Sequence, residues 1–220
     1  MIDKNIINVI VPVYNEEKTI ENVILNLGKI KFIDKVLVVN DASTDSTQKI
    51  ISKYAKKFII LNNKINKGKG YCVAKALSSI NNGLVVILDS DIIGYKRKHI
   101  LDLCYPVIKN KVDFTLGTTK FKTYIQPKGN LSSLIGQRCY RLKDLKPLQR
   151  KIFKTTRYGF EMFLNKEFEL KKHKLIYLKG TKHYTKFEKY TLIKALWSYV
   201  KEGVSILGQF IKDFRYDKIT

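Results

Sequence analysis

Residues 84–92 read Leu-Val-Val-Ile-Leu-Asp-Ser-Asp-Ile, an apolar run that ends on two carboxylates, Asp89 and Asp91. A run of this length without polar alternation predicts a strand that is buried on both faces. In open α/β sheets, ligands bind beyond the carboxyl ends of the strands, which is where these two acids would lie. Carboxylates one residue apart can hold a divalent cation that bridges phosphates. The run therefore predicts a metal and nucleotide site, with an ordinary solvated turn as the alternative.

Upstream of this run, three polar loops each precede a predicted helix. The first two of these loops each follow an apolar run. The loops are Pro-Val-Tyr-Asn-Glu at 12–16, Asn-Asp-Ala-Ser-Thr-Asp at 40–45 and Asn-Lys-Gly-Lys-Gly at 66–70. The helices are predicted at residues 15–28, 44–56 and 70–81, the first with Asn15 as its N-cap. Glycines let backbone approach a ligand, and a helix N-terminus beside lysines attracts anions. The sequence thus predicts an α/β fold with a mostly parallel, twisted, Rossmann-like sheet and helices on both faces.

Taken in order, the three loops and the Asp-Ser-Asp at 89–91 resemble the motifs of the family-2 glycosyltransferases, which have the GT-A fold. Two later segments resemble acceptor-side motifs of a narrower branch, the polyprenyl-phosphate sugar transferases and glucosyl-3-phosphoglycerate synthase. These segments are Gly-Gln-Arg-Cys-Tyr-Arg at 136–141 and Tyr-Gly-Phe-Glu at 158–161. The resemblance implies an inverting, metal-dependent transferase that takes its sugar from a UDP- or GDP-linked nucleotide-diphosphate sugar.

The resemblance also implies a donor site in the first half of the chain. Its expected members come from the loops that follow the predicted strands: Pro12, Tyr14, Glu16, Asp41, Lys67, Gly68 and Asp89. Asp91 would act in catalysis as the ligand of Mg²⁺ or Mn²⁺. His183 would be a second ligand, or else a surface histidine in a polar loop. His99 and His173 lie in Lys-rich contexts, so we expect them to face solvent.

On the acceptor side, Glu161 would be a general base or would orient an acceptor hydroxyl, unless it is only a helix N-terminal acid. Arg138 and Arg141 lie in a helical region predicted over 131–145. They would bind a phosphorylated acceptor, because a guanidinium can hold phosphate with two parallel hydrogen bonds. Arg138 could equally pair with Asp144 on the surface. The expected acceptor is a polyprenyl phosphate or a small phosphorylated compound.

Residues 1–188 are expected to form the GT-A domain, with a donor half at 1–92 and an acceptor half at 93–188. Residues 189–220 carry apolar side chains at helical spacing with lysines on other faces, which predicts an amphipathic helix. This helix would pack on its own domain, lie in an anionic membrane surface, or form a homodimer. The three alternatives stay open at this point.

The formal net charge of the 220 residues is +23, concentrated after residue 95. Such a charge attracts anionic partners, but no nucleic-acid-binding motif accompanies it, so we expect no nucleic acid. Three scattered cysteines without metal-ligand spacing predict reduced thiols and a cytoplasmic protein. Peripheral contact with the inner face of the membrane is compatible with the charge.

Two other classes of protein remain as alternatives. A sugar-phosphate nucleotidyltransferase would share the sheet and the metal, but we would expect a Gly-rich, Arg-containing phosphate loop, which residues 11–17 lack. A non-enzymatic basic binding module would not explain two carboxylates at the end of a buried strand.

Overall fold

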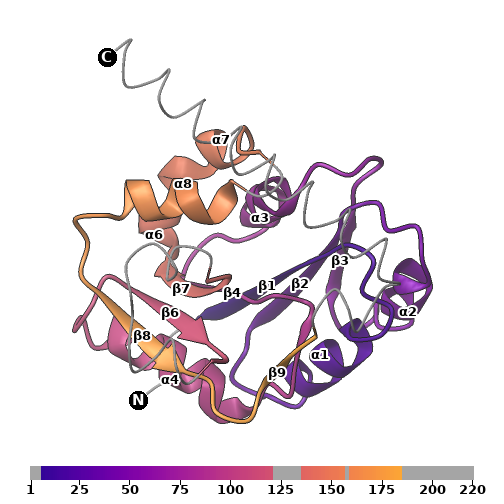
Figure 1. Ribbon diagram of the computed structural model, residues 1–220, viewed down its shortest axis with the longest axis horizontal. Coiled ribbons are helices and arrows are strands. Elements are labelled where there is room, and N and C mark those ends of the chain that lie inside the picture. The colour runs from indigo at the N-terminus through magenta and orange to yellow at the C-terminus, as the bar shows by residue number, and fades with distance from the viewer. Residues whose placement is uncertain (1–5, 121–134, 157–158, 185–220) are drawn as a thin grey trace.

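A seven-stranded sheet forms the centre of the computed structural model, which describes residues 6–120, 135–156 and 159–184 (Figure 1). Its strands are β1 (Ile7–Val13), β2 (Lys35–Asn40), β3 (Ile59–Asn62), β4 (Leu84–Ile87), β6 (Phe114–Thr118), β7 (Gln137–Arg141) and β8 (His173–Tyr177). Their spatial order is β3-β2-β1-β4-β7-β6-β8, and β7 runs antiparallel to both of its neighbours. The other pairings are parallel, so the predicted mostly parallel sheet is confirmed.

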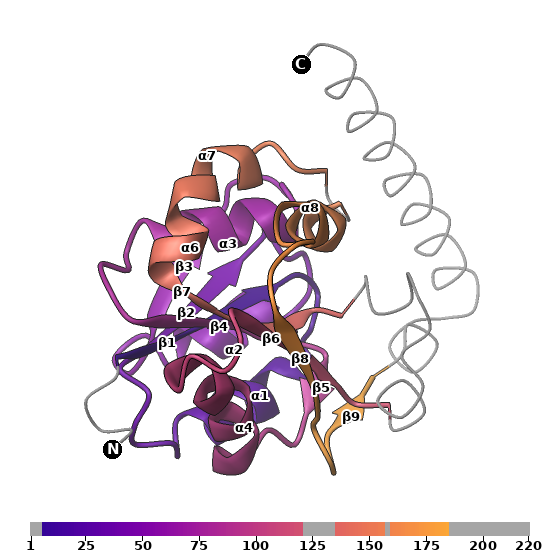
Figure 2. The ribbon, with the colours of Figure 1, turned by 90° about the vertical axis from the view of Figure 1, so that its left-hand side faces the viewer.

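Helices cover both faces of this sheet, as predicted (Figure 2). One face carries α1 (Ile20–Leu27), α2 (Thr47–Ser52) and α4 (Arg97–Ile108). The other carries α3 (Lys69–Leu77), α6 (Leu142–Leu145), α7 (Gln149–Ile152) and α8 (Phe160–Glu167), with a 3-10 turn at Lys146–Leu148. A separate two-stranded ribbon pairs β5 (Ile92–Ile93) with β9 (Lys182–His183). The core therefore consists of two apolar layers, one on each side of the sheet.

The first helix shows how the apolar stripe sets this packing. Ile20, Val23, Ile24 and Leu27 are all buried against the sheet, as their spacing predicts. Each fully buried side chain of this size contributes roughly 1.5–3 kcal/mol. The helix begins at Ile20 instead of residue 15, so the prediction that Asn15 is its N-cap is wrong. Asn15 has a φ of 54° and instead joins its loop to the neighbouring loop through hydrogen bonds.

The helical region predicted over 131–145 is also wrong where the structure describes it, because residues 137–141 form β7. This strand lies inside the sheet and is buried along most of its length. Its polar side chains are accommodated because they hydrogen-bond to Asp89 after β4, to Asn165 in α8 and to the Val107 carbonyl in α4. The sequence signal fails because a strand with Gln and Arg at three of five positions has neither the apolar run nor the alternation expected of a strand.

The order of the strands fixes where a ligand can bind. The chain moves outward from β1 to β2 and β3, then returns to β4 on the opposite side of β1. In open α/β sheets, this change of direction leaves a crevice at the carboxyl ends of the two central strands. Within β1, only Ile7–Ile10 pair with β4, so Pro12 lies beyond the last β1–β4 pair. The N–H group that proline lacks therefore costs no hydrogen bond to β4. The loops that follow β1 and β4 border this crevice.

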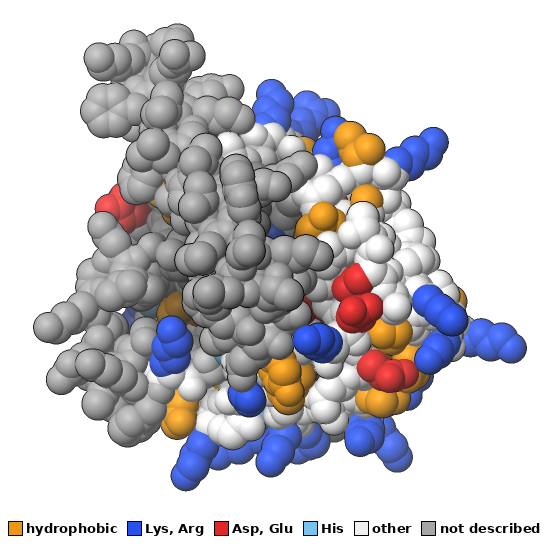
Figure 3. Space-filling model, turned by 45° about the vertical axis from the view of Figure 1, so that its right-hand side comes forward, with side chains coloured by type: hydrophobic (Ala, Val, Ile, Leu, Met, Phe, Trp, Pro, Cys, Tyr) orange, Lys and Arg blue, Asp and Glu red, His pale blue; other side chains and the backbone are white. Residues whose placement is uncertain are grey.

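One of the sequence predictions concerns a part of the chain beyond this core. The amphipathic helix predicted at 189–220 lies outside the described residues. Within the described residues, no helix is both long and apolar enough to cross a membrane. Lys and Arg side chains are spread around the described part of the face in Figure 3 and are not gathered in one place.

Candidate functional site

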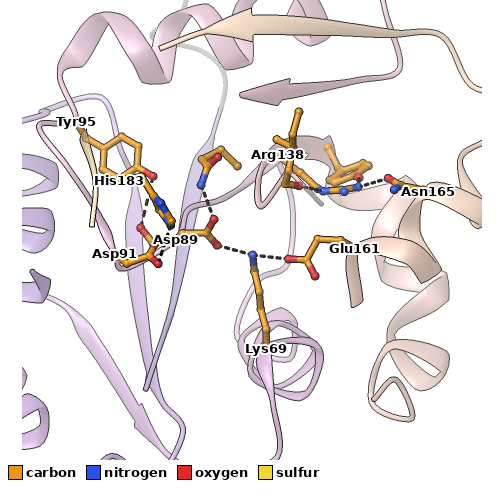
Figure 4. A network of polar contacts seen from close by, with 11 residues as sticks. Lys69, Asp89, Asp91, Tyr95, Arg138, Glu161, Asn165 and His183 are labelled. Carbon is orange, nitrogen blue, oxygen red and sulfur yellow. Dashed lines mark hydrogen bonds and ion pairs between the residues drawn. The ribbon is translucent and has the colours of Figure 1, made fainter. Parts of the chain in front are cut away.

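An ammonium group joins two carboxylates at the crevice between β1 and β4 (Figure 4). Lys69, the first residue of α3, contacts Asp89 and lies 2.6 Å from Glu161, measured from Nζ to Oε1. Asp89 follows β4, whereas Glu161 lies in the first turn of α8 on the other side of the crevice. Burial opposes the charge on Lys69, but the two carboxylates outweigh it and raise the pKa of the ammonium. Lys69 therefore stays charged and connects the residue that follows β4 to the first turn of α8.

Asp89 is held in place by the residues that precede and begin β7. The Gln137 side chain donates a hydrogen bond of 2.5 Å from Nε2 to Oδ2 of Asp89. A Cβ atom at Gly136 would collide with both carboxylate oxygens, so any other residue there would have to displace Asp89. Burial raises the pKa of the Asp89 carboxyl, while the neighbouring Lys69 ammonium opposes that rise. The first part of the segment predicted to bind the acceptor thus holds Asp89, which was predicted to bind the donor.

Asp91 and His183 come together although 92 residues separate them in the chain. His183 Nε2 lies 3.1 Å from Asp91 Oδ2, and both side chains are partly exposed to solvent (Figure 4). The β5–β9 ribbon creates this contact by pairing Ile92 directly with His183. The backbone N–H of Tyr184 also donates to the Asp91 carbonyl at 2.9 Å. The structure therefore places the two predicted metal ligands side by side.

The loops after β1 and β2 are joined by a ladder of short polar contacts. The backbone N–H of Thr44 donates to Asn15 Oδ1 at 2.8 Å, and the N–H of Asn15 donates to Ser43 Oγ at 3.0 Å. The N–H of Glu16 donates to Thr47 Oγ1 at 2.8 Å. The Glu16 carboxylate accepts from the Thr19 hydroxyl, so it stabilises the start of α1. Such cross-linked loops form a preorganised wall beside the crevice.

Of the predicted donor residues in these loops, Tyr14 is the most accessible, with 43% of its surface exposed. Pro12 is buried within β1.

Asp41 has a structural role that the sequence did not show. Its carboxylate accepts hydrogen bonds from the backbone N–H groups of Lys67 (2.9 Å) and Gly68 (2.6 Å) and from the Asn63 side chain (2.7 Å). Asp41 is buried, and Gly68 has a φ of 92°, which favours glycine. Asp41 therefore fixes the loop that leads into α3 and sets the position of Lys69.

The Lys67 side chain is exposed, and its Nζ lies over the Tyr71 ring. Lys69 is therefore the lysine of this loop that reaches the carboxylates.

Arg138 does not lie on the surface, so the predicted surface pair with Asp144 is wrong. Its side chain is fully buried and donates hydrogen bonds to the Ile135 carbonyl, the Tyr140 hydroxyl and Asn165 Oδ1 at 2.7–3.2 Å. Figure 4 shows the guanidinium directed toward Asn165 on the α8 side of the crevice. These contacts hold the Arg138 guanidinium inside the protein, and its role in binding a phosphorylated acceptor stays a prediction.

Arg141 lies at the opposite end of β4 from Asp89. It pairs with Leu84 at the amino end of β4, far along the strand from Asp89. Its guanidinium donates to the carbonyls of Val107 (2.7 Å) and Asp113 (3.2 Å) and lines a cavity of about 660 Å³ at that edge. Because β7 is a strand, Arg138 and Arg141 lie roughly 10 Å apart along its axis, and the acceptor role of Arg141 stays a prediction.

His99 differs from its prediction, whereas His173 agrees with it. His173 is exposed. His99 is 4% exposed, and its ring nitrogens contact the Lys96 N–H (3.1 Å) and the Lys179 carbonyl (3.0 Å). Burial lowers the pKa of His99, which favours the neutral ring.

The charges of this site suit a divalent cation. The Lys69 ammonium contacts the carboxylates of Asp89 and Glu161, and a third carboxylate, Asp91, lies close enough to Asp89 to raise its pKa, so negative charge is in excess. The described residues contain no cluster of three or more side chains that could by themselves hold a metal. Asp91 and His183 offer one oxygen and one nitrogen donor, which fits an ion that takes its remaining ligands from a diphosphate and water.

Comparison with known proteins places this chain in a family. Residues 8–173 match the family description "Glycosyl transferase family 2". The chain belongs to glycosyl transferase family 2, so the resemblance seen in the four donor motifs is confirmed.

Two curated relatives show how far the likeness extends. A dolichyl-phosphate beta-glucosyltransferase of Trichomonas vaginalis is 32% identical over 97 residues, which are 39% of this chain and 30% of that protein. The poly-beta-1,6-N-acetyl-D-glucosamine synthase of Staphylococcus aureus is 30% identical over 128 residues, which are 56% of this chain and 29% of that protein. The matched residues thus span less than a third of either relative.

Solved structures share the whole architecture. Glucosyl-3-phosphoglycerate synthase of Mycobacterium tuberculosis, in complex with Mn²⁺, uridine diphosphate and glucosyl-3-phosphoglycerate, superposes with a TM-score of 0.68 at 19% identity. The match covers 94% of this chain and 80% of that one. S. aureus TarS gives a TM-score of 0.65 at 23% identity, covering 84% and 61% of the two chains. The predicted GT-A fold is confirmed.

The site contains residues that the sequence predictions did not include. Lys69 was noted as a positive charge near a helix N-terminus, but nothing distinguished it from Lys67. The distinguishing signal is that Lys69 is the first helical residue and lies one turn before the buried positions Cys72 and Val73. Gln137 gives no local signal, because its partner Asp89 is 48 residues away.

Proposed function

We propose that this protein is an inverting glycosyltransferase that moves a sugar from a nucleotide-diphosphate sugar, most simply a UDP-sugar, to a phosphorylated acceptor. The observation that carries the proposal is the meeting of Asp89, Asp91, Lys69, Glu161 and His183 at the crevice between β1 and β4. The family places a transferase domain there, and the crevice lies where α/β sheets bind nucleotides.

The donor is held by the loops that follow β1 and β2. Tyr14 and the backbone of the cross-linked loops border the space for the base and ribose, and Asp89 is directed toward the same space by Gln137. Asp41 acts indirectly, because it fixes the loop of Lys67 and Gly68. This arrangement presents the anomeric carbon to the acceptor side of the crevice.

Mg²⁺ or Mn²⁺ would be held by Asp91 and His183. When bound, such an ion supplies positive charge to the leaving diphosphate. The M. tuberculosis synthase of the same fold is described with Mn²⁺, UDP-glucose and phosphoglyceric acid, which supports the same class of donor and metal here.

The acceptor would bind between Glu161 on α8 and the donor. An anionic phosphate oxygen attacks the anomeric carbon while the bond to the diphosphate breaks, and the nucleoside diphosphate leaves with the electron pair. A phosphate acceptor needs no deprotonation, so Glu161 would orient it through Lys69; a hydroxyl acceptor would need Glu161 as a base. The relatives support a polyprenyl phosphate or a small phosphorylated acid.

The decisive experiment separates donor binding from transfer. Thermal shift with UDP- and GDP-sugars should show stabilisation by a UDP-sugar, and more in the presence of Mn²⁺; a ligand at 100 times its Kd adds about 2.7 kcal/mol. Transfer is then measured to polyprenyl phosphate and to 3-phosphoglycerate. Asp91→Asn should abolish transfer and the Mn²⁺ effect without lowering the Tm of the apoprotein. Metal-independent transfer, or full activity of Asp91→Asn, would reject the metal site.

A further inference from the structure

Two arms of the chain carry the proposed metal ligands. The first arm runs from Asp91 through β5 to the start of α4, and the second runs from Leu178 through β9 to Tyr184. His183, near the end of the second arm, contacts Asp91, at the beginning of the first arm. Next to this contact, β5 of the first arm pairs with β9 of the second. The distance between the ligands therefore depends on how the two arms are held together.

His99 joins the arms at a second place, where the first arm ends in α4 and the second arm begins. It lies in the first turn of α4 and is 4% exposed. Its Nε2 lies 3.0 Å from the carbonyl oxygen of Lys179, in the turn just before β9. This contact crosses 80 residues of sequence and links the first arm to the second.

The contacts of the His99 ring determine which of its two nitrogens carries the proton. The backbone N–H of Lys96 donates to Nδ1 at 3.1 Å, so Nδ1 carries a lone pair. In the neutral ring the proton then lies on Nε2, where it is donated to the Lys179 carbonyl. The two nitrogens thus act differently, because Nδ1 caps the start of α4 whereas Nε2 binds the second arm.

We propose that His99 is a positioning residue that holds the arm of His183 against the arm of Asp91. It touches neither ligand and acts through Lys179 and the turn of Gly180 and Thr181. The carbonyl of Gly180 lies against Gly94 in the first arm, where a Cβ would sit at 3.1 Å from that oxygen, so the arms are already close at this level. The inference about metal binding rests on the proposed function, but the joining of the arms does not.

Two substitutions separate the contributions of the two ring nitrogens. In His99→Asn, the side-chain oxygen lies near the position of Nδ1 and can accept from Lys96, but the side chain is too short to reach Lys179. In His99→Gln, the amide nitrogen lies near the position of Nε2 and can donate to Lys179, but the acceptor for Lys96 is lost. His173→Asn, at an exposed histidine outside the site, is the matched control.

The metal-free measurement is amide hydrogen exchange of Tyr184, whose N–H donates to the Asp91 carbonyl across the arms. We expect His99→Asn to accelerate this exchange by roughly 2- to 10-fold, the effect of one lost hydrogen bond. His99→Gln should keep it near the wild-type rate while lowering the Tm through the lost cap. Equal exchange in His99→Asn and wild type would overturn the proposal, as would equal acceleration by both variants.

The second measurement is the dissociation constant of Mn²⁺ in the presence of UDP, by calorimetry. His99→Asn should weaken Mn²⁺ by a similar factor of roughly 2 to 10, and His99→Gln and His173→Asn should not. If wild type binds no Mn²⁺ while the exchange result holds, the proposed metal site fails and the joining of the arms stands. If wild type binds Mn²⁺ and all variants bind it equally, the positioning role for the metal is rejected.

Discussion

At the scale of single residues, the absence of a side chain at Gly136 determines where the Asp89 carboxylate can lie. The Asp89 carboxylate occupies the space that a Cβ atom at Gly136 would take. A glycine from the segment predicted to bind the acceptor thus makes room for Asp89, which was predicted to bind the donor.

Gly136→Ala should therefore push Asp89 away from Gln137 and Lys69. Overpacking of this kind costs roughly 1–3 kcal/mol, and we expect a loss of donor binding beyond that of stability. Calorimetry with UDP and chemical denaturation measure the two effects. Gly28→Ala is the control, since a Cβ there meets mainly the flexible end of Lys57. Unchanged UDP affinity in Gly136→Ala would show that the placement of Asp89 is irrelevant to the donor.

Asp41 makes a second prediction at this scale. In Asp41→Asn, an NH₂ group replaces one carboxylate oxygen. This group cannot accept a hydrogen bond from a backbone N–H, so at least one of the three hydrogen bonds of Asp41 is lost. A buried donor left without a partner costs about 1–3 kcal/mol in stability, and the displaced loop should weaken UDP binding. Asp144→Asn, at a partly exposed acid distant from the crevice, should change neither. Normal stability with weak UDP binding would instead indicate direct contact between Asp41 and the nucleotide.

At the scale of elements, β7 is the strand that the sequence described least well. The apolar runs of β1, β2 and β4 are visible because both faces of the sheet are covered by helices, and the stripe of α1 follows from the same burial. β7 lacks this apolar signal because it contains the polar residues Gln137, Arg138 and Arg141. Each of them hydrogen-bonds to a group that is distant in sequence. Local periodicity cannot reveal such partners, since they exist only once the sheet has formed.

Arg138 gives a prediction about this strand. Arg138→Ala should lower the free energy of unfolding by roughly 3–5 kcal/mol, because a large buried side chain is removed and its acceptors lose their donors. Urea denaturation measures this loss. Arg150→Ala, at an exposed position of α7, should stay within about 0.5 kcal/mol of wild type. An Arg138→Ala protein of normal stability that has only a raised KM for the acceptor would instead support the role in phosphate binding.

At the scale of the whole molecule, the parallel strands and helices of residues 6–92 could be predicted from the sequence, whereas the arrangement of residues 93–184 could be predicted only in part. The four donor motifs lie on loops that directly follow strands or open helices, so their spacing in sequence reflects their spacing in the sheet. Asp91 and His183 were linked by the family resemblance alone, and no periodicity could have brought together residues 92 positions apart. His99 was expected in solvent because its neighbours are lysines, yet the ring points inward from the first turn of α4.

The buried neutral ring predicts how the stability of the molecule varies with pH. Burial lowers the pKa of His99 in the folded protein below the value of about 6.5 in the unfolded chain. The folded state then binds fewer protons, so the contribution of His99 is complete above about pH 6.5 and decreases as the pH falls from there toward the lowered pKa. Asp102 opposes this shift, whereas Lys96 and Lys98 reinforce it.

Urea denaturation at pH 5 and pH 7.5 tests this prediction. Wild type should lose more stability at pH 5 than His99→Asn does, because the variant has no ring to protonate. His173→Asn should lose as much as wild type. Parallel losses in wild type and His99→Asn would show that the pKa of His99 is the same in the folded and the unfolded protein.

The insertion of β7 between β4 and β6 has a consequence for synthesis on the ribosome. Every donor motif has been made once residue 91 has been added, but the free edge of β4 finds its partner only when residues 137–141 follow. At roughly 5–20 residues per second, that edge stays open for about 3–10 s. An open apolar strand edge is a template for wrong pairing. We therefore expect a nascent chain arrested after residue 120 to aggregate or to engage chaperones, whereas one arrested after β7 has emerged does neither, so the acceptor half also protects the donor half while the protein is being made.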